Sequence, residues 1–186
     1  MTNAPHIQSM IKRLARLEAA EMWSDGLNPA QRAALEYLGQ ANRFSRAPSH
    51  VAEYLGSTRG TVSQTLKALL RKGYVVEERS EEDKRSIWFD LTPQGEAALK
   101  RQSSLARSLN ALSPGETSAL ESTLKATLKG ALTHNGQKPF GVCKTCKYFQ
   151  SHRKGPSEGG HCQLLDVDLT GPGTEKICHE HQPSDA

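Results

Sequence analysis

All four cysteines of the 186-residue chain lie in its last quarter, and the first 142 residues contain none. Cys143 and Cys146 form a C-x2-C pair, and Cys162 and Cys178 each follow after fifteen further residues. A segment as short as residues 140–186 rarely buries enough apolar surface to fold without a cross-link or a bound metal. We therefore expect three parts: a domain over residues 1–133, a linker over 134–139 and a four-cysteine domain over 140–186.

The rest of the chain indicates the compartment in which these thiols reside. The N-terminus carries charges throughout and has no uninterrupted apolar run, unlike a signal peptide. No segment approaches the run of about 20 apolar residues that a membrane helix needs. We expect a cytoplasmic protein without a membrane partner, whose thiols stay reduced. Two disulfides are then disfavoured, the clustering disfavours four unrelated thiols, and a four-cysteine metal site remains as the interpretation.

The spacing of apolar residues indicates a helical N-terminal region. Apolar positions recur at helical intervals over residues 7–22, 28–38 and 49–55. A fourth helix is expected from Ser57, as its N-cap, to residue 72. One side of this helix would carry Val62, Leu66, Leu69 and Leu70.

The spacing changes after Gly73. Residues 74–80 and 86–92 are rich in β-branched and aromatic side chains and flank the polar turn EEDKR, which is typical of a β-hairpin. Thr92-Pro93 predicts a helix to about Leu112, and Ser113-Pro114 predicts another to Leu132. The fold class is therefore mainly α with a small β-hairpin: a winged helix-turn-helix with flanking dimerisation helices, followed by a small metal-stapled segment.

Positive charge is concentrated before the cysteines. Residues 1–139 hold 19 Lys and Arg against 14 Asp and Glu, whereas residues 140–186 hold 5 against 6. The stretch 58–72 contains four basic residues and no acidic one. Such a patch indicates either a surface for a polyanion, with nucleic acid as the first candidate, or a solvated helix face.

The segments LLRKGYVVEER, EDKR and LTPQGE, all between residues 55 and 97, resemble the MarR family of bacterial transcriptional regulators, and the order of elements matches over residues 7–132. The resemblance implies a homodimer that binds double-stranded DNA at a pseudo-palindromic operator. The apolar stripes over residues 7–20 and 105–132 agree with pairing of two subunits. The alternative is that these side chains all close the core of one monomer.

The expected helix over residues 57–72 presents short polar and basic side chains opposite its apolar side. Arg59 can form two hydrogen bonds with guanine and Gln64 can do so with adenine, whereas Lys67 suits a phosphate. Thr61 and Ser63 fit either a base contact or a hydrogen bond with the helix backbone. The candidate DNA-binding residues of this helix are Ser57, Arg59, Thr61, Ser63, Gln64 and Lys67.

The hairpin tip supplies a second candidate DNA contact. MarR-like proteins carry an Asp-x-Arg signature here, which implies an arginine that enters a groove and an aspartate that holds it. The corresponding residues are Asp83 and Arg85, with Lys84 between them.

The surroundings of the cysteines resemble the cluster-binding half of high-potential iron–sulfur proteins: CKTCKYF over 143–149, then HCQLL over 161–165, a Gly/Pro turn and Cys178. The resemblance implies an iron–sulfur cluster, and we favour [4Fe–4S]. Ile177 and His179 stand where aromatic residues would shield such a cluster, so oxidants or nitric oxide would reach it more easily. Zn²⁺ and [2Fe–2S] are the alternatives, although zinc ribbons usually present two C-x2-C pairs. Three nearby histidines are either additional ligands or neighbours of the ligands: His161, His179 and His181.

The sequence therefore predicts a DNA-binding transcriptional regulator, with a repressor favoured, whose operator affinity responds to an iron–sulfur cluster on the four cysteines. We expect the cysteine segment to act on the last dimerisation helix, which directly precedes it. One alternative is a zinc-stapled regulator that senses a small molecule between the dimer helices and the DNA-binding domain. Another is a redox protein or electron carrier. An enzyme is not expected, because the chain has no phosphate loop or nucleophile motif in context.

Overall fold

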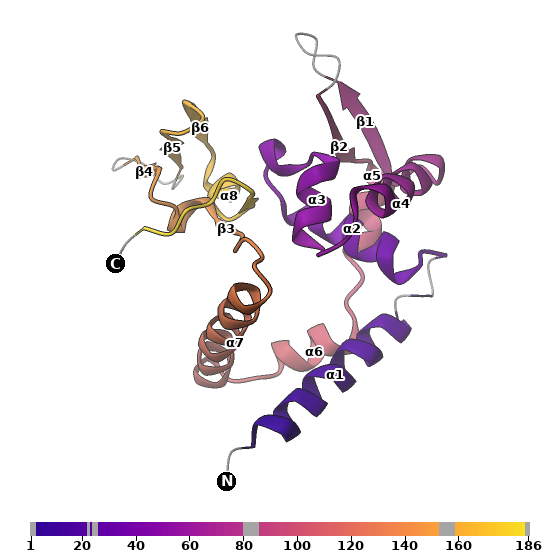
Figure 1. Ribbon diagram of the computed structural model, residues 1–186, viewed down its shortest axis with the longest axis vertical. Helices are drawn as coiled ribbons and strands as arrows, with labels where there is room; N and C mark the ends of the chain where they lie inside the picture. The colour runs from indigo at the N-terminus through magenta and orange to yellow at the C-terminus, as the bar shows by residue number, and fades with distance from the viewer. Residues whose placement is uncertain (1–2, 22, 24–25, 80–85, 153–158, 185–186) are drawn as a thin grey trace.

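The computed structural model describes residues 3–21, 23, 26–79, 86–152 and 159–184, and every structural statement below concerns these residues. Figure 1 shows a winged-helix body, an arm of helices that extends away from it, and a small strand-rich unit beside the body. Over the described residues, no helix combines the length and apolarity needed to cross a membrane.

The winged-helix body contains three helices and a hairpin: α2 (Pro29–Gln40), α3 (Pro48–Tyr54), α4 (Arg59–Arg71), β1 (Val75–Arg79) and β2 (Ile87–Leu91). The strands pair antiparallel, from Val75 opposite Leu91 to Arg79 opposite Ile87. One hydrophobic core joins these elements, and its buried members are Leu27, Ala34, Leu35, Tyr37, Leu38, Ala41, Val51, Ala52, Val62, Leu66, Leu69, Val75 and Phe89. The expected winged helix-turn-helix is confirmed.

Local hydrogen bonds fix where these helices begin. Asn28 Oδ1 accepts a hydrogen bond from the Gln31 N–H at 2.9 Å, and Gln31 Oε1 accepts one from the Asn28 N–H at 3.2 Å. This capping box starts α2. For α4 the cap is Thr58, whose Oγ1 accepts from the Thr61 N–H at 3.1 Å. Ser57, which the sequence predicted as the cap, lies one residue outside because Thr58 offers the same hydroxyl in the geometry that α4 needs.

The helix predicted from residue 93 to residue 112 is two helices, α5 (Pro93–Leu99) and α6 (Ser104–Asn110). Ser103 caps α6 with a hydrogen bond from the Ala106 N–H at 3.1 Å. The two helices also have different partners: α5 packs on α2 and β2, whereas α6 packs on α1 (Ala4–Glu21). The prediction of one continuous helix was therefore wrong, since a single straight helix could not meet both.

Gly95 of the LTPQGE segment sits where α5 presses on the start of the hairpin. Thr92 Oγ1 donates to the Gly73 carbonyl oxygen at 2.6 Å and accepts from the Gly95 N–H at 3.1 Å. A Cβ on Gly95 would stand 2.2 Å from the carbonyl oxygen of Tyr74. Only glycine fits this contact without a backbone shift.

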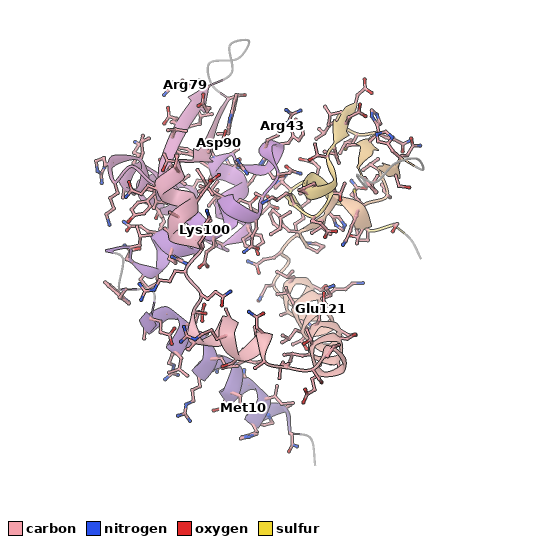
Figure 2. The ribbon with its side chains drawn as sticks, turned by 180° about the vertical axis from the view of Figure 1, so that it is seen from behind. Met10, Arg43, Arg79, Asp90, Lys100 and Glu121 are labelled. Carbon is pink, nitrogen blue, oxygen red and sulfur yellow. The ribbon has the colours of Figure 1, made fainter. Side chains whose placement is uncertain are left out.

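The arm consists of α1, α6 and α7 (Pro114–His134). Ser113 and Glu116 form the capping box that starts α7. Neither α1 nor α7 has a buried residue, although both carry apolar stripes. Figure 2 shows Met10 of α1 and Glu121 of α7 far from the hairpin that carries Arg79.

The C-terminal residues form a cysteine unit of two small sheets. In one sheet β3 (Gly141–Val142) pairs antiparallel with β7 (Ile177–Cys178). In the other, β5 (Gly160–Cys162) lies between β4 (Phe149–Ser151) and β6 (Val167–Leu169). Two short helices complete it, η3 (Cys143–Thr145) and α8 (Gly171–Thr174).

Candidate nucleic-acid interface and cysteine site

One face of α4 packs on the body and the other is open to solvent. Val62, Leu66 and Leu69 are buried, and α4 contacts α2 and α3. Leu70, which was predicted on the apolar side, is 36% exposed because eight residues at 3.6 per turn place it about 80° around α4 from the buried Val62. The outer face carries basic side chains and no acidic one.

Most of the predicted DNA-binding residues lie on this open face. Ser57, Arg59, Gln64 and Lys67 are exposed, whereas Ser63 is half-buried. The exposed hydroxyl of Thr61 lies 2.9 Å from the hydroxyl of Thr58, the N-cap residue of α4. The wing residues Asp83, Lys84 and Arg85 lie outside the described residues.

The cysteine unit brings the four cysteines into one small fold. The Cys146 N–H donates to the Cys143 carbonyl oxygen at 3.0 Å, so the C-x2-C pair forms a tight turn. Cys178 pairs with Gly141 across β3–β7, and Cys162 pairs with Phe149 across β4–β5. Cys143 and Cys178 are buried, whereas Cys146 and Cys162 are partly exposed.

The two buried cysteines interact directly. Their thiols hydrogen-bond to each other, which together with burial raises the pKa of Cys143. The same contact lowers the pKa of the Cys178 thiol to about 6, and hydrogen bonds from Asn42, the Glu180 backbone and Ser45 act in the same direction. Thiolate is the form of cysteine that binds metals, and a lowered pKa favours that form.

The described residues, which include all four cysteines, contain no group of three or more His, Cys, Asp or Glu side chains placed to hold a metal ion. Zinc bound tetrahedrally at 2.3 Å by four sulfurs would hold them about 3.8 Å apart. The donor set has the chemistry of a thiolate site, but the sulfurs as they stand do not form a mononuclear one.

The three histidines next to the cysteines in the sequence have different surroundings. His161 Nδ1 lies 3.0 Å from Asp168 Oδ1. His179 lies between two carboxylates, with Nδ1 2.9 Å from Glu180 Oε1 and Nε2 2.7 Å from Glu53 Oε2. His181 Nε2 lies 3.0 Å from Thr145 Oγ1, while its Nδ1 is buried with no hydrogen-bond partner in the described structure. The contacts of His161 and His179 support the interpretation that they neighbour the ligands.

The cysteine unit docks on the winged-helix body next to η2 (Arg43–Ser45), the 3₁₀ helix between α2 and α3. The Asn42 N–H donates to the Ile177 carbonyl oxygen at 2.8 Å, and the His179 N–H donates to Ser45 Oγ at 2.8 Å. Phe140 packs edge-on against Tyr54, with ring centroids 5.1 Å apart. The sequence predicted action through the last dimerisation helix, but these contacts join the unit to α2, η2 and α3.

Sequence reasoning missed this docking surface. Asn42 lies 101 positions from its sulfur partner Cys143, so no local pattern connects the two. The role of Phe140 as an aromatic anchor depends on Tyr37 and Tyr54 in the body, which lie far from it in the sequence. In the sequence, Asn42 is an asparagine before the short stretch RFS. Many loops contain such a pattern, so it does not indicate a docking surface.

Comparison with known proteins gives the family. Residues 25–86 match a sequence model described as "MarR family". The chain is 32% identical over 109 residues to YkoM of Bacillus subtilis (strain 168), described as an uncharacterized HTH-type transcriptional regulator, and the alignment covers 54% of this chain and 67% of that protein. The chain belongs to the MarR family.

Solved structures agree with the MarR fold. MepR from S. aureus in a DNA complex has a TM-score of 0.55 at 19% identity, covering 70% of this chain and 98% of that one. FabT from Streptococcus pneumoniae in complex with DNA has a TM-score of 0.53 at 21% identity, covering 69% and 94%. A MarR regulator from Methanosarcina mazei Go1 has a TM-score of 0.56 at 20% identity, covering 69% and 98%.

This MarR-family chain also contains a cavity of about 860 Å³ where the arm meets the body. Its walls combine acidic and basic side chains from α1, α2, the α5–α6 connection and α6. Glu18 Oε2 is buried with no hydrogen-bond partner in the described structure. The charged lining residues are Glu18, Glu21, Arg32, Glu36, Arg101 and Arg107.

Proposed function

We propose that the protein binds a pseudo-palindromic DNA operator as a homodimer and that its affinity responds to an iron–sulfur cluster on the four cysteines. The observation that carries the proposal is the open, basic, acid-free face of α4 on a MarR-family body. Relatives of this fold have been solved with DNA, which supports the same use here. A repressor is the form we favour.

The exposed apolar surface of the arm supports a homodimer. Ile7, Ile11 and Leu14 of α1 are each more than 40% exposed. A groove of about 510 Å³ on α6 and α7 is lined by Leu109, Leu120, Leu124 and Leu128, among others. Single chains seldom leave so many large apolar side chains in water. A second copy would cover them and place two α4 helices about 34 Å apart, one turn of DNA.

We favour a [4Fe–4S] cluster over a single zinc ion for this unit, which supplies the four thiolates that such a cluster takes. In a [4Fe–4S] cluster each thiolate binds a different iron atom, so the sulfurs stand wider apart than around zinc. The ligands would be Cys143, Cys146, Cys162 and Cys178. When bound, the cluster would supply reactivity toward oxidants or nitric oxide. The protein buries two of the ligands and leaves the other two partly open to such agents.

The proposal is tested on full-length protein purified without oxygen. We expect a brown protein that contains iron and acid-labile sulfide. It should select one inverted-repeat sequence from a random pool of duplexes. Each Cys→Ser change should lower the iron content while the helical content stays constant, and Ser151→Ala in β4 is a control that removes a hydroxyl but no thiol. A colourless protein with one bound zinc ion contradicts the cluster, and a protein that selects no sequence contradicts the regulator.

The charged cavity gives a second candidate function, a small-molecule effector site. Its volume suits a drug-sized ligand, and the unpartnered oxygen of Glu18 offers an acceptor within it. A cationic or polar effector that binds there would change the position of the arm relative to the body. Release of operator by such a compound, with iron content unchanged, would favour this function over cluster sensing.

A further inference from the structure

We infer that two residues of the winged-helix body, Asn42 and Ser45, complete the cysteine site, and that the body senses the state of this site directly through η2. The inference rests on the proposed function and names the route of its regulation.

Asn42 reaches a cysteine sulfur from the body. Its Nδ2 donates to Cys143 Sγ at 3.6 Å, within the range of a hydrogen bond to sulfur, and the residue is 7% exposed. Ser45 Oγ accepts a hydrogen bond at 2.8 Å from the backbone N–H of His179, the residue after Cys178, and Ser45 is 1% exposed. The body therefore reaches the sulfur of one buried cysteine and the backbone beside the other.

Donors of this kind influence the properties of a thiolate site. An N–H or O–H group aimed at a sulfur stabilises its negative charge, and such partners tune the affinity and potential of the metal that the sulfur binds. Cys146 receives its donor from within the unit, the Gln182 N–H at 3.5 Å from its sulfur. The site is thus shared: the unit supplies the ligands, and the body supplies a donor to Cys143 and a hydrogen-bond acceptor to the backbone next to Cys178.

Asn42 and Ser45 are held in place by the body itself. Asn42 Oδ1 accepts from the Phe44 N–H at 3.0 Å, which orients the amide so that its Nδ2 faces the sulfur. The Tyr37 hydroxyl donates to the Ser45 carbonyl oxygen at 2.7 Å in the buried core. The turn from Asn42 to Ser45 is therefore anchored to α2 on one side and to the cysteine unit on the other.

Two sets of contacts lead from this turn to the DNA-binding elements. The first enters the hairpin: the Phe89 N–H donates to the Arg46 carbonyl oxygen at 3.2 Å, and the Arg46 guanidinium pairs with Asp90. Figure 2 shows Asp90 on the hairpin strand below Arg79.

The second set enters α3. The His179 ring stacks on His50 with centroids 3.8 Å apart, and His179 Nε2 lies 2.7 Å from Glu53 Oε2. Because α3 packs on α4, movement of β7 acts on the helix that faces DNA.

The cysteine ligands would link β7 to the rest of the cysteine unit, and this link determines how β7 docks on the body. β7 carries both Cys178 and the carbonyl oxygen of Ile177 that accepts from Asn42. Loss of the cluster would free β7 from the cysteines of η3 and β5 and weaken its docking on η2. Docked and released arrangements of the unit are then the two states between which the cluster selects.

The first experiment replaces Asn42 by aspartate in the full chain. Asn42→Asp keeps the oxygen that accepts from Phe44 but puts an acceptor in place of the donor to Cys143. We expect a shifted visible spectrum, a lower midpoint potential and several-fold faster loss of iron to a chelator. The matched control is Asn28→Asp, the same change at the N-cap of α2, whose oxygen accepts from Gln31. The control should behave as wild type in all three measurements.

The second experiment removes the ion pair between Arg46 and Asp90, which joins the turn after η2 to the hairpin, and changes no partner of a cysteine sulfur. Wild type should differ about 5- to 150-fold in operator affinity between the cluster-loaded and cluster-free forms, the usual range of coupling between sites. Arg46→Met should lower this ratio toward one at unchanged iron content. Arg79→Met is the control, because Arg79 pairs with Glu77 on β1 and would change both affinities by the same factor.

The outcomes separate this inference from the proposed function. Wild-type protein that binds no metal overturns both. A wild type with a cluster, combined with an Asn42→Asp variant of unchanged spectrum, potential and iron loss, overturns the inference alone. If Asn42→Asp does not fold, Ser45→Ala takes its place, and its wild-type behaviour would have the same meaning. An unchanged affinity ratio in Arg46→Met overturns the route through the hairpin.

Discussion

His50 is a histidine whose ionisation opposes the docking of the cysteine unit. Burial lowers its pKa, and so does the charge of His179, while Glu180 and Glu53 act in the opposite direction. A base whose folded-state pKa lies below its unfolded value binds fewer protons when folded. Its contribution to stability is therefore complete above the ordinary histidine pKa and is lost as the pH falls below it.

We expect the cysteine unit to become more sensitive to protease as the pH falls from about 7 to about 5. His50→Phe keeps an aromatic ring for His179 to stack on and removes the proton, so it should flatten this pH dependence. His6→Phe, at an exposed site on α1, is the control and should leave it unchanged. A pH profile that is the same in wild type and His50→Phe would show that His50 has no part in it.

Arg59 is exposed at the start of α4, where we propose that it reads a base. Arg59→Ala should cost about 1–3 kcal/mol of operator binding and relax specificity at one position per half-site. Lys67→Ala should weaken binding to all sequences more evenly and reduce its salt dependence. Fluorescence titration with operator and random duplexes checks both, and equal losses on the two duplexes for Arg59→Ala would make Arg59 a phosphate anchor.

Among the secondary-structure elements, α4 allows a test of which residue caps its start, Thr58 as in the structure or Ser57 as the sequence predicted. Thr58→Ala removes the hydroxyl that accepts from the Thr61 N–H and should cost about 0.5–2 kcal/mol of unfolding free energy. Ser57→Ala, one residue earlier, should lower the unfolding free energy much less than Thr58→Ala does, because Thr58 supplies the cap hydrogen bond of α4. Urea unfolding measures both variants. A larger loss in Ser57→Ala than in Thr58→Ala would return the cap to Ser57.

The connection between α5 and α6 shows how elements acquire their partners. The Ser104 N–H donates to Glu21 Oε2 at 2.7 Å, which ties the start of α6 to the end of α1. The Ser104 hydroxyl also donates to this carboxyl, and the two hydrogen bonds, the hydroxyl's first, lower the pKa of Glu21. The break in the predicted helix is thus the joint at which the chain leaves the body and enters the arm.

For the whole molecule, the exposed apolar arm predicts that folding and dimerisation are linked. Leu124→Asp, in the groove on α7, should convert the dimer to a monomer and weaken operator binding by more than any single contact on α4. Light scattering and operator titration measure the two effects. Lys129→Asp, at an exposed polar position on the same helix, is the control for the added charge. A Leu124→Asp protein that remains a dimer would place the dimer contact elsewhere.

The sequence by itself determined the local elements of this protein. The apolar periodicity of α2 and α4, the hairpin and the caps with Pro at the first turn depend on side chains within a few positions of one another. The exposed face of α4 follows from the same periodicity, so Arg59, Gln64 and Lys67 could be predicted as a candidate surface. The four cysteines could likewise be assigned to one unit from their spacing.

Tertiary structure decided which surfaces meet. The helix after the hairpin divides because α5 and α6 pack on different partners, and the cysteine unit rests on η2 because Phe140, Ile177 and His179 fit the surface that Tyr37, Asn42 and Ser45 present. These contacts join residues about a hundred positions apart, and complementarity of two separately folded surfaces leaves no periodic trace in either segment. The partnership of Asn42 with Cys143 is of this kind, so it emerged only when the chain was folded.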